Sequence, residues 1–251
     1  MLVMGILNVT PDSFADGGRH NDYDAAVTRG LEMIDEGVDI IDIGGESTRP
    51  GADRVTEAEE IARTIPVITE LAKHGVKISI DTMRATTAEA AINAGASIIN
   101  DVSGGLADPH MLQTAARLQV PYIAMHWRGQ SKDMNSKAFY GDVVTDVISE
   151  LKERITAALE AGIHDSNLII DPGLGFAKDA HHNWEIIDSI EAFVALGYPV
   201  LVGGSRKRFL GGDSPDDREQ ATIELTKRLA ATGVWAVRVH SVKPHKEVLA
   251  K

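Results

Sequence analysis

Alternation of two kinds of segment along the whole chain constrains its fold more than any other feature. Eight short apolar runs have the length and composition of buried strands, at 2–7, 40–43, 76–80, 97–99, 122–125, 168–170, 200–202 and 235–239. Amphipathic segments with helical spacing follow them, at 22–36, 57–74, 87–93, 109–118, 143–161, 183–196, 217–232 and 243–249. Such alternation is typical of a parallel sheet covered by helices, and eight repeats favour a closed (β/α)8 TIM barrel over an open sheet.

The length of the chain agrees with one such barrel. It has 251 residues, and about 250 is typical of this fold. No linker, charge block or low-complexity segment divides it, so we predict a single α/β domain over 1–251. The connections that precede strands are short and contain glycine, as expected at helix C-termini. These glycines are Gly37, Gly75, Gly95, Gly162, Gly197 and Gly233.

Composition excludes several classes of protein. The chain has no cysteine, which rules out disulfides, thiolate nucleophiles and cysteine-bound metals. Its formal net charge of −12 argues against a surface for nucleic acid or anionic membranes. No apolar stretch approaches the roughly 20 residues that span a bilayer, and the N-terminus does not resemble a signal peptide. We therefore expect a soluble, cytoplasmic protein.

Every predicted strand ends in polar residues. In order, these are Asn8, Asp42, Asp81, Asn100 with Asp101, His126, Asp171, the segment 204–207, and Arg238 with His240. In a barrel the carboxyl ends of all strands meet at one face, where active sites lie. Any one of these residues could instead cap a helix N-terminus, and we interpret Asp42 and Asp101 in that way. Polar residues at all eight junctions are more than capping requires, which predicts an active site.

Acidic and amide side chains form the first group at this face. Asp81, Asn100 and Asp171 complement a flat heterocycle with adjacent N–H donors and a carbonyl, such as a 2-amino-4-oxo-pyrimidine ring. The alternative is a metal site, although Mg²⁺ sites usually borrow phosphate oxygens as well.

Cationic side chains form the second group, and a long loop accompanies them. Arg49, Arg206, Lys207, Arg208, Arg238 and His240 follow the second, seventh and eighth strands. In an acidic protein this concentration predicts an anion site, and barrels often bind phosphate near strands seven and eight. The connection from Asn8 to the first helix is longer than the usual two to six residues. No serine carries a G-x-S-x-G motif, so nucleophilic catalysis is not supported.

Together these segments resemble the dihydropteroate synthase family. The resemblance runs in order from about residue 3 to 250 with the family's spacings. Its two most specific segments are M-G-I-L-N-V-T-P-D-S-F-A-D-G-G at 4–18 and D-I-G-G-E-S-T-R-P-G-A at 42–52. The others are S-I-D-T at 79–82, I-I-N-D-V-S-G-G at 98–105, D-P-G-L-G-F-A-K at 171–178, G-G-S-R-K at 203–207 and R-V-H at 238–240.

The resemblance implies a (β/α)8 barrel that condenses 6-hydroxymethyl-7,8-dihydropterin pyrophosphate with p-aminobenzoate. The products are 7,8-dihydropteroate and pyrophosphate, in folate biosynthesis. Pyrophosphate would leave first, and p-aminobenzoate would capture the pterin methylene cation. The resemblance also implies Mg²⁺ as cofactor, a homodimer, and sulfonamides as ligands of the aminobenzoate pocket.

Site residues carry over from the matching motifs. The pterin would be bound by Asp81, Asn100, Asp171 and Lys207. The pyrophosphate would be bound by Asn8, Arg238 and His240, with Mg²⁺ at Asn8. Two loops carrying Asp16, Thr48 and Arg49 would close over p-aminobenzoate, beside Phe14, Phe176 and Ser205. The catalytic residues implied are Asp16, Arg49, Lys207, Arg238 and His240.

Four positions differ from the family's common pattern, and two other functions remain as alternatives. The positions are Ala177, Gly204, Arg208 and Ser241, and we expect Gly204 and Arg208 to border the aminobenzoate pocket. One alternative is a pterin-binding paralogue with little or no synthase activity. The other is a pterin-dependent methyltransferase on the same barrel, which would not need a pyrophosphate site.

Overall fold

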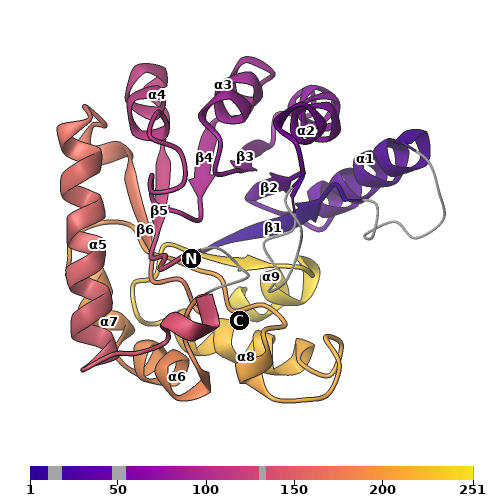
Figure 1. The fold of residues 1–251 in the computed structure, drawn as a ribbon. Coiled ribbons are helices and arrows are strands. Elements are labelled where there is room, and N and C mark those ends of the chain that lie inside the picture. The colour runs from indigo at the N-terminus through magenta and orange to yellow at the C-terminus, as the bar shows by residue number, and fades with distance from the viewer. Residues whose placement is uncertain (11–18, 47–54, 130–133, 251) are drawn as a thin grey trace.

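A ring of helices surrounds eight parallel strands in the computed structural model, which describes residues 1–10, 19–46, 55–129 and 134–250 (Figure 1). The strands are β1 Leu2–Asn8, β2 Ile40–Gly44, β3 Lys77–Asp81, β4 Ile98–Asp101, β5 Tyr122–Met125, β6 Leu168–Asp171, β7 Leu201–Val202 and β8 Ala236–Val239. Their order is β6-β5-β4-β3-β2-β1-β8-β7, and a parallel bridge between Ile170 and Val200 joins the two edges. The prediction of a single (β/α)8 barrel is confirmed.

The helices follow the predicted segments with one difference. They are α1 Arg19–Asp35, α2 Glu57–Ala72, α3 Ala85–Asn93, α4 Met111–Leu118, α5 Val143–Glu160, α6 Ala180–Asp188, α7 Ile190–Val194, α8 Glu219–Leu229 and α9 Lys243–Leu249. Short 3₁₀ turns lie at η2 Met134–Lys137, η3 Asp165–Asn167 and η4 Arg208–Leu210. The single helix predicted at 183–196 is two helices, because the backbone leaves the helical region at Ser189. All six predicted C-terminal glycines have positive φ, which confirms their role.

Apolar side chains fill the N-terminal half of the barrel. This inner layer consists of Met4, Ile40, Ile98, Ile123, Ile169, Leu201 and Ala236, all buried. Branched side chains from neighbouring strands pack into such layers in a (β/α)8 barrel, so the interior is a core and not a channel. Burying each large side chain contributes about 1.5–3 kcal/mol.

Alternate strand residues face outward and pack against the helices. Helix α2 illustrates why the sequence folds in this way. The Thr56 hydroxyl caps its N-terminus by accepting from the Glu59 amide at 3.3 Å. One face then buries Val67, Ile68 and Leu71 at helical spacing against the barrel.

Strand register creates a polar layer above the inner apolar one. Side chains alternate across a strand, so a residue two positions after an inner-layer residue also points into the barrel. Ile40, Ile98, Ile169 and Ala236 are followed at that spacing by Asp42, Asn100, Asp171 and Arg238. Asp81 lies opposite Asn100 in the β3–β4 register. The polar strand ends predicted from the sequence therefore enter the same end of the barrel.

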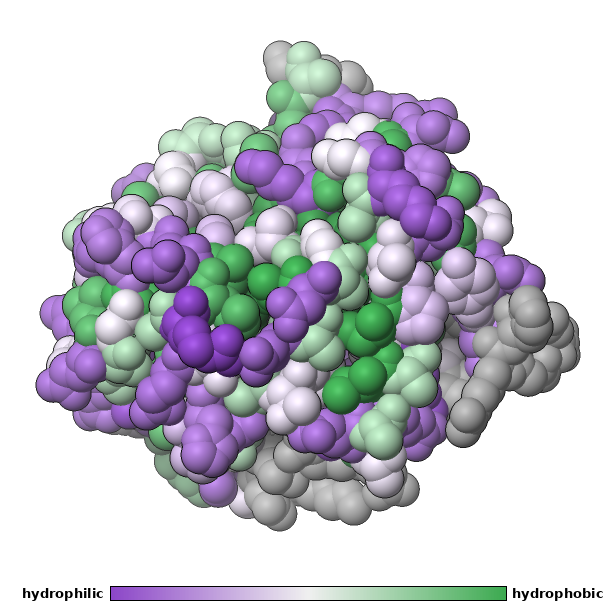
Figure 2. All heavy atoms as spheres, turned by 90° about the horizontal axis from the view of Figure 1, so that it is seen from above, coloured by the Kyte–Doolittle hydropathy of each residue, from purple (hydrophilic) through white to green (hydrophobic). Residues whose placement is uncertain are grey.

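On the face drawn in Figure 2, hydrophilic and hydrophobic residues are interspersed. Among the helices within the described residues, none is both long and apolar enough to cross a bilayer.

Candidate active site

Arg238 is the centre of the polar layer. Its Nε donates to Asp42 Oδ2 at 2.6 Å, and its Nη2 donates to Asp81 Oδ2 at 2.6 Å. Asn100 Nδ2 donates to the same Asp42 oxygen at 3.1 Å. The interpretation of Asp42 as a helix cap is therefore wrong. Its side chain points inward from β2, is fully buried, and holds the Arg238 guanidinium in place.

Burial and the neighbouring charges shift the pKa values of this group in opposite directions. Burial raises the pKa of Asp81 to about 7, while the guanidinium of Arg238 acts in the other direction. Burial alone would lower the pKa of Arg238, but the Asp42 and Asp81 carboxylates raise it. Arg238 therefore stays charged, and the layer combines one fixed cation with a carboxyl group, Asp81, whose pKa is raised by burial.

Asp171 and Lys207 occupy the neighbouring part of the layer. Asp171 Oδ1 accepts from the Gly173 amide at 2.7 Å, which leaves Oδ2 for other partners. Burial raises the pKa of Asp171, opposed by the Gly173 N–H and Lys207. Burial lowers the pKa of Lys207 to about 8, opposed by Asp171. The Lys207 ammonium donates to the Leu174 carbonyl and lies 4.6 Å from the Phe176 ring centroid.

Ser205 and His240 lie beside each other at the ends of β7 and β8. Ser205 Oγ is 2.9 Å from His240 Nδ1 and accepts from the His240 amide at 3.2 Å. A hydroxyl next to an imidazole can hold an oxyanion through a donor on each group. Of the cations in the predicted anion site, Lys207 and Arg238 lie close enough for their charges to interact, and His240 is held by Ser205.

The Arg206 side chain does not join the predicted anion site. Arg206 has φ of 56°, and its side chain turns toward α8, where Nε donates to Glu219 Oε2 at 2.7 Å. Its Nη2 donates to Ser241 Oγ at 2.8 Å. Arg208 is exposed at the start of η4. The grouping of Arg206 with the other cations is therefore wrong, while the role of Arg208 at the aminobenzoate pocket stays a prediction.

Gly204 packs closely against helix α8. A Cβ built on Gly204 would lie 2.7 Å from Leu225 Cδ2 of α8, and 3.9 Å from Phe209 Cζ. A side chain at this position would therefore point into the β7–α8 packing. That Gly204 borders the aminobenzoate pocket stays a prediction.

Asp101 organises the connection after β4. Its carboxylate accepts from the amides of Ser103 at 2.8 Å and Gly105 at 2.7 Å, and from the Tyr122 hydroxyl at 2.8 Å. Helix α4 begins only at Met111, after His110, so the interpretation of Asp101 as a helix cap is wrong. Its carboxylate instead stabilises the turn that follows β4.

A second buried polar group lies at the ends of β5 and β6, next to Asp171. Its members could not be recognised as one group from the sequence. Lys178 Nζ is 2.8 Å from His126 Nδ1, and His126 Nε2 is 2.9 Å from Glu150 Oε2. Arg128 pairs with Glu150 through Nε at 3.0 Å and lies 3.8 Å from the Tyr140 ring centroid. The one signal in the sequence was the position of His126 and Lys178 in the loops after adjacent strands, β5 and β6.

Burial and neighbouring charges shift the pKa values in this second group. Burial lowers the pKa of Lys178 to about 7, opposed by Asp171. Burial and the Lys178 charge lower the pKa of His126 to about 4. Burial alone would raise the pKa of Glu150, but hydrogen bonds from His126 and Arg128 lower it to about 2. His126 is thus neutral at pH 7, with Glu150 as the carboxylate of the group.

Glu150 should contribute stability that depends on pH. Because its folded pKa lies below the ordinary value of 4.5, that stability is present above about pH 4.5 and is lost as pH falls toward 2. Glu150→Gln should lower the free energy of unfolding by about 1 kcal/mol at pH 7, since the side chain is about one-third exposed. Urea unfolding should show this deficit shrinking at pH 3. Glu153→Gln, at an exposed position of the same helix, is the control, and an equal pH dependence there would contradict the assignment.

Comparison with known proteins decides the family. The family described as pterin binding enzyme matches residues 4–240. The dihydropteroate synthase of Mycobacterium leprae is 48% identical over 98% of this chain and 90% of its own length. The structure of the Xanthomonas albilineans dihydropteroate synthase with 4-aminobenzoic acid is 43% identical, with a TM-score of 0.93, over 99% of this chain and 90% of that one. The Yersinia pestis dihydropteroate synthase in a sulfonamide complex is 39% identical, with a TM-score of 0.93, over 99% and 92% of the two chains.

The chain belongs to the dihydropteroate synthase family.

The structure brings together the four residues expected to bind the pterin. Asp81, Asn100, Asp171 and Lys207 lie around Arg238 in one layer, although their roles as dihydropteroate synthase ligands stay predictions. Several of the other expected site residues lie outside the described residues. These are Phe14, Asp16, Thr48 and Arg49.

Asn8 is the residue that the family resemblance assigns to Mg²⁺. It is half-buried at the C-terminal end of β1, opposite Gly44 of β2. Its amide oxygen is a suitable ligand for a hard cation. Within residues 1–10, 19–46, 55–129 and 134–250, no three histidine or acidic residues form a group that could hold a metal. The donors therefore fit Mg²⁺ only when substrate phosphate supplies further oxygens.

Proposed function

We propose that this chain condenses 6-hydroxymethyl-7,8-dihydropterin pyrophosphate with p-aminobenzoate, giving 7,8-dihydropteroate and pyrophosphate. The observation that carries the proposal is the polar layer of Asp81, Asn100, Asp171 and Lys207, closed below by apolar residues, in a chain of this family. Convergent polar groups above an apolar floor are expected of a site for a flat ring.

Recognition of the pterin follows from the inventory of donors and acceptors. The 2-amino-4-oxo-pyrimidine ring presents adjacent N–H groups, which Asp171 Oδ2 and a second acceptor can bind. Asn100 can accept and donate at once, and Lys207 can donate to the ring carbonyl or a ring nitrogen. Burial of Asp171 strengthens these contacts, because little water competes for them.

Departure of pyrophosphate requires positive charge at the place where negative charge develops on the leaving oxygen. Arg238, His240 and the Ser205 hydroxyl would hold the pyrophosphate at the ends of β7 and β8. Mg²⁺, held by Asn8 and phosphate oxygens, would neutralise further charge on the leaving group. The methylene cation that remains is stabilised by the pterin ring and by nearby carboxylates. No nucleophilic side chain is needed.

The amine of p-aminobenzoate would then attack the methylene carbon. Phe176 offers an apolar wall next to Lys207, and Ser205 a polar group near the mouth. One structure of the family contains 4-aminobenzoic acid and another a sulfonamide drug, which supports binding of both kinds of ligand by this chain. We therefore expect sulfonamides to compete with p-aminobenzoate here.

The proposal is tested by pyrophosphate release from the purified protein with Mg²⁺ and the pterin pyrophosphate. Release that depends on p-aminobenzoate, with dihydropteroate formed, is the expected result. Pterin binding without release would instead favour the paralogue. The methyltransferase alternative is disfavoured because the similar proteins of known name are synthases. The homodimer and the cytoplasmic location stay predictions.

A further inference from the structure

We propose that Lys178 is a positioning residue that, together with Tyr140, holds the β6–α6 loop in the conformation that presents Asp171 and Phe176 to the substrates. The inference rests on the proposed function, since it assigns a purpose to the loop that carries two of its binding residues. The loop runs from the end of β6 at Asp171 to the start of α6 at Ala180.

Lys178 uses all the N–H groups of its ammonium in hydrogen bonds to the loop and to His126. Its Nζ donates to the carbonyls of Gly173 and Phe176, each at 3.1 Å, and its third neighbour is His126 Nδ1 at 2.8 Å. An ammonium has three N–H groups, so these three acceptors use all of them. The residue is 7% exposed. Lys178 therefore has no donor left for a substrate, and its contacts fix the loop instead.

A strained backbone lies inside the same loop. Ala177 has φ of 49°, a left-handed conformation that is unfavourable for a residue with a Cβ. Its carbonyl accepts from the Tyr140 hydroxyl at 2.9 Å, and the preceding carbonyl of Phe176 accepts from Lys178. Hydrogen bonds thus hold the peptide groups on both sides of the strained residue. Strain that persists near a binding site indicates that the surrounding contacts hold it there for a purpose.

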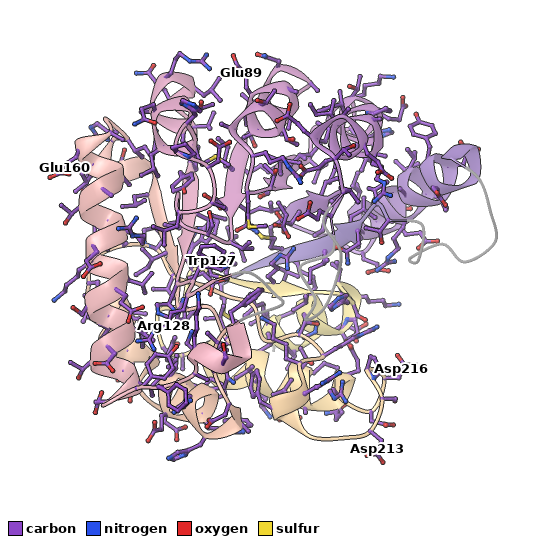
Figure 3. All side chains as sticks on the ribbon, viewed as in Figure 1. Glu89, Trp127, Arg128, Glu160, Asp213 and Asp216 are labelled. Carbon is purple, nitrogen blue, oxygen red and sulfur yellow. The ribbon has the colours of Figure 1, made fainter. Side chains whose placement is uncertain are left out.

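The clamp made by Lys178 and Tyr140 is anchored to the rest of the barrel. Because Lys178 donates to Nδ1 of His126, the imidazole carries its proton on Nε2 and donates to Glu150 of α5. Arg128, which lies between α5 and η2 in Figure 3, pairs with Glu150 and stacks on the Tyr140 ring. The Glu150 carboxylate therefore balances the charge of Lys178. It connects Lys178, through His126, and Tyr140, through Arg128, to helix α5.

The first experiment compares Lys178→Met with Lys246→Met. Lys246 is the matched control, because its ammonium pairs with Asp39 at 2.9 Å, and Asp39 precedes β2 at the other end of the barrel. We expect Lys178→Met to raise the Kd for the pterin pyrophosphate and the KM for p-aminobenzoate by about 10-fold to 100-fold. The control should stay within about twofold. Wild-type Kd and KM in folded Lys178→Met would overturn the proposal.

Hydrogen exchange gives a readout that needs no turnover. The amides of Gly173 and Phe176 are bonded within the loop, to Asp171 Oδ1 and the Gly173 carbonyl. They should exchange faster in Lys178→Met but not in Lys246→Met. If the wild-type protein releases no pyrophosphate, the proposed function fails, while the exchange rates still decide the clamp. Unchanged exchange in an active enzyme would reject the clamp alone.

A second pair of variants covers the case in which Lys178→Met does not fold. Tyr140→Phe removes one hydroxyl and should raise the KM for p-aminobenzoate by several-fold. Ala177→Gly removes the cost of the left-handed backbone, so the effect of Tyr140→Phe should be smaller in the Ala177→Gly background. Equal effects of Tyr140→Phe in both backgrounds would show that the clamp does not act on Ala177 and would overturn the proposal.

Discussion

Asp171→Ala should weaken binding of the pterin pyrophosphate by about 100-fold or more. The substitution removes the buried acceptor for the ring N–H groups, and hydrogen bonds to a charged group are worth about 1.5–3 kcal/mol each. The substitution also removes a carboxylate whose charge raises the pKa of Lys207. The buried Lys207 ammonium therefore loses an electrostatic partner. Isothermal titration calorimetry at pH 7 measures the Kd directly.

Asp165→Ala is the matched control for this experiment. Asp165 is exposed in η3, at the other end of β6, and bonds only to the Tyr198 hydroxyl among the side chains of the described residues. Its Kd should stay within about twofold of wild type. If Asp171→Ala bound the pterin pyrophosphate as the control does, Asp171 could not be the ring's partner.

Arg238→Met should have the largest effect on stability. It leaves the Asp42 and Asp81 carboxylates in the barrel without their cation, and breaking a buried pair in this way costs about 3–5 kcal/mol. Pyrophosphate release should also be lost, because the leaving group loses its fixed positive charge. Urea unfolding and the release assay measure the two effects separately.

A double variant separates charge from packing in the same group. Asp42→Asn in the Arg238→Met background removes one of the uncompensated charges, so it should recover part of the lost stability while pyrophosphate release stays absent. If the double variant were less stable than Arg238→Met by the full cost of Asp42→Asn alone, the two residues would not be coupled. That result would contradict the pairing of Arg238 with Asp42.

Local patterns in the sequence were sufficient to predict the fold. Runs of branched apolar residues and glycines at helix ends depend on the nearest neighbours in the chain, and they placed every strand to within about two residues. The break at Ser189 was missed, because the amphipathic pattern continues across it. The face of the site was also predictable, since parallel strands all end at the same side of a barrel.

Individual partners in the site were not predictable in this way. Asp42 looked like a helix cap because a sequence does not show which strand residues point inward, and its partner Arg238 is 196 positions away. Arg206 and Lys207 are adjacent in the chain, yet one reaches Glu219 and the other the Leu174 carbonyl. The left-handed backbone at Arg206 separates them.

The sequence by itself determined the barrel, the end of it that carries the polar residues, and the family. These follow from the period of the hydrophobic residues, the spacing of the polar residues and the sequence motifs, which are all properties of short segments. Only the tertiary structure decided that Asp42 holds Arg238, that Gly204 faces α8, and that Lys178 holds the loop behind Asp171. Each of these depends on burial and on distances between strands and helices far apart in the chain, where low dielectric makes every charge require a partner.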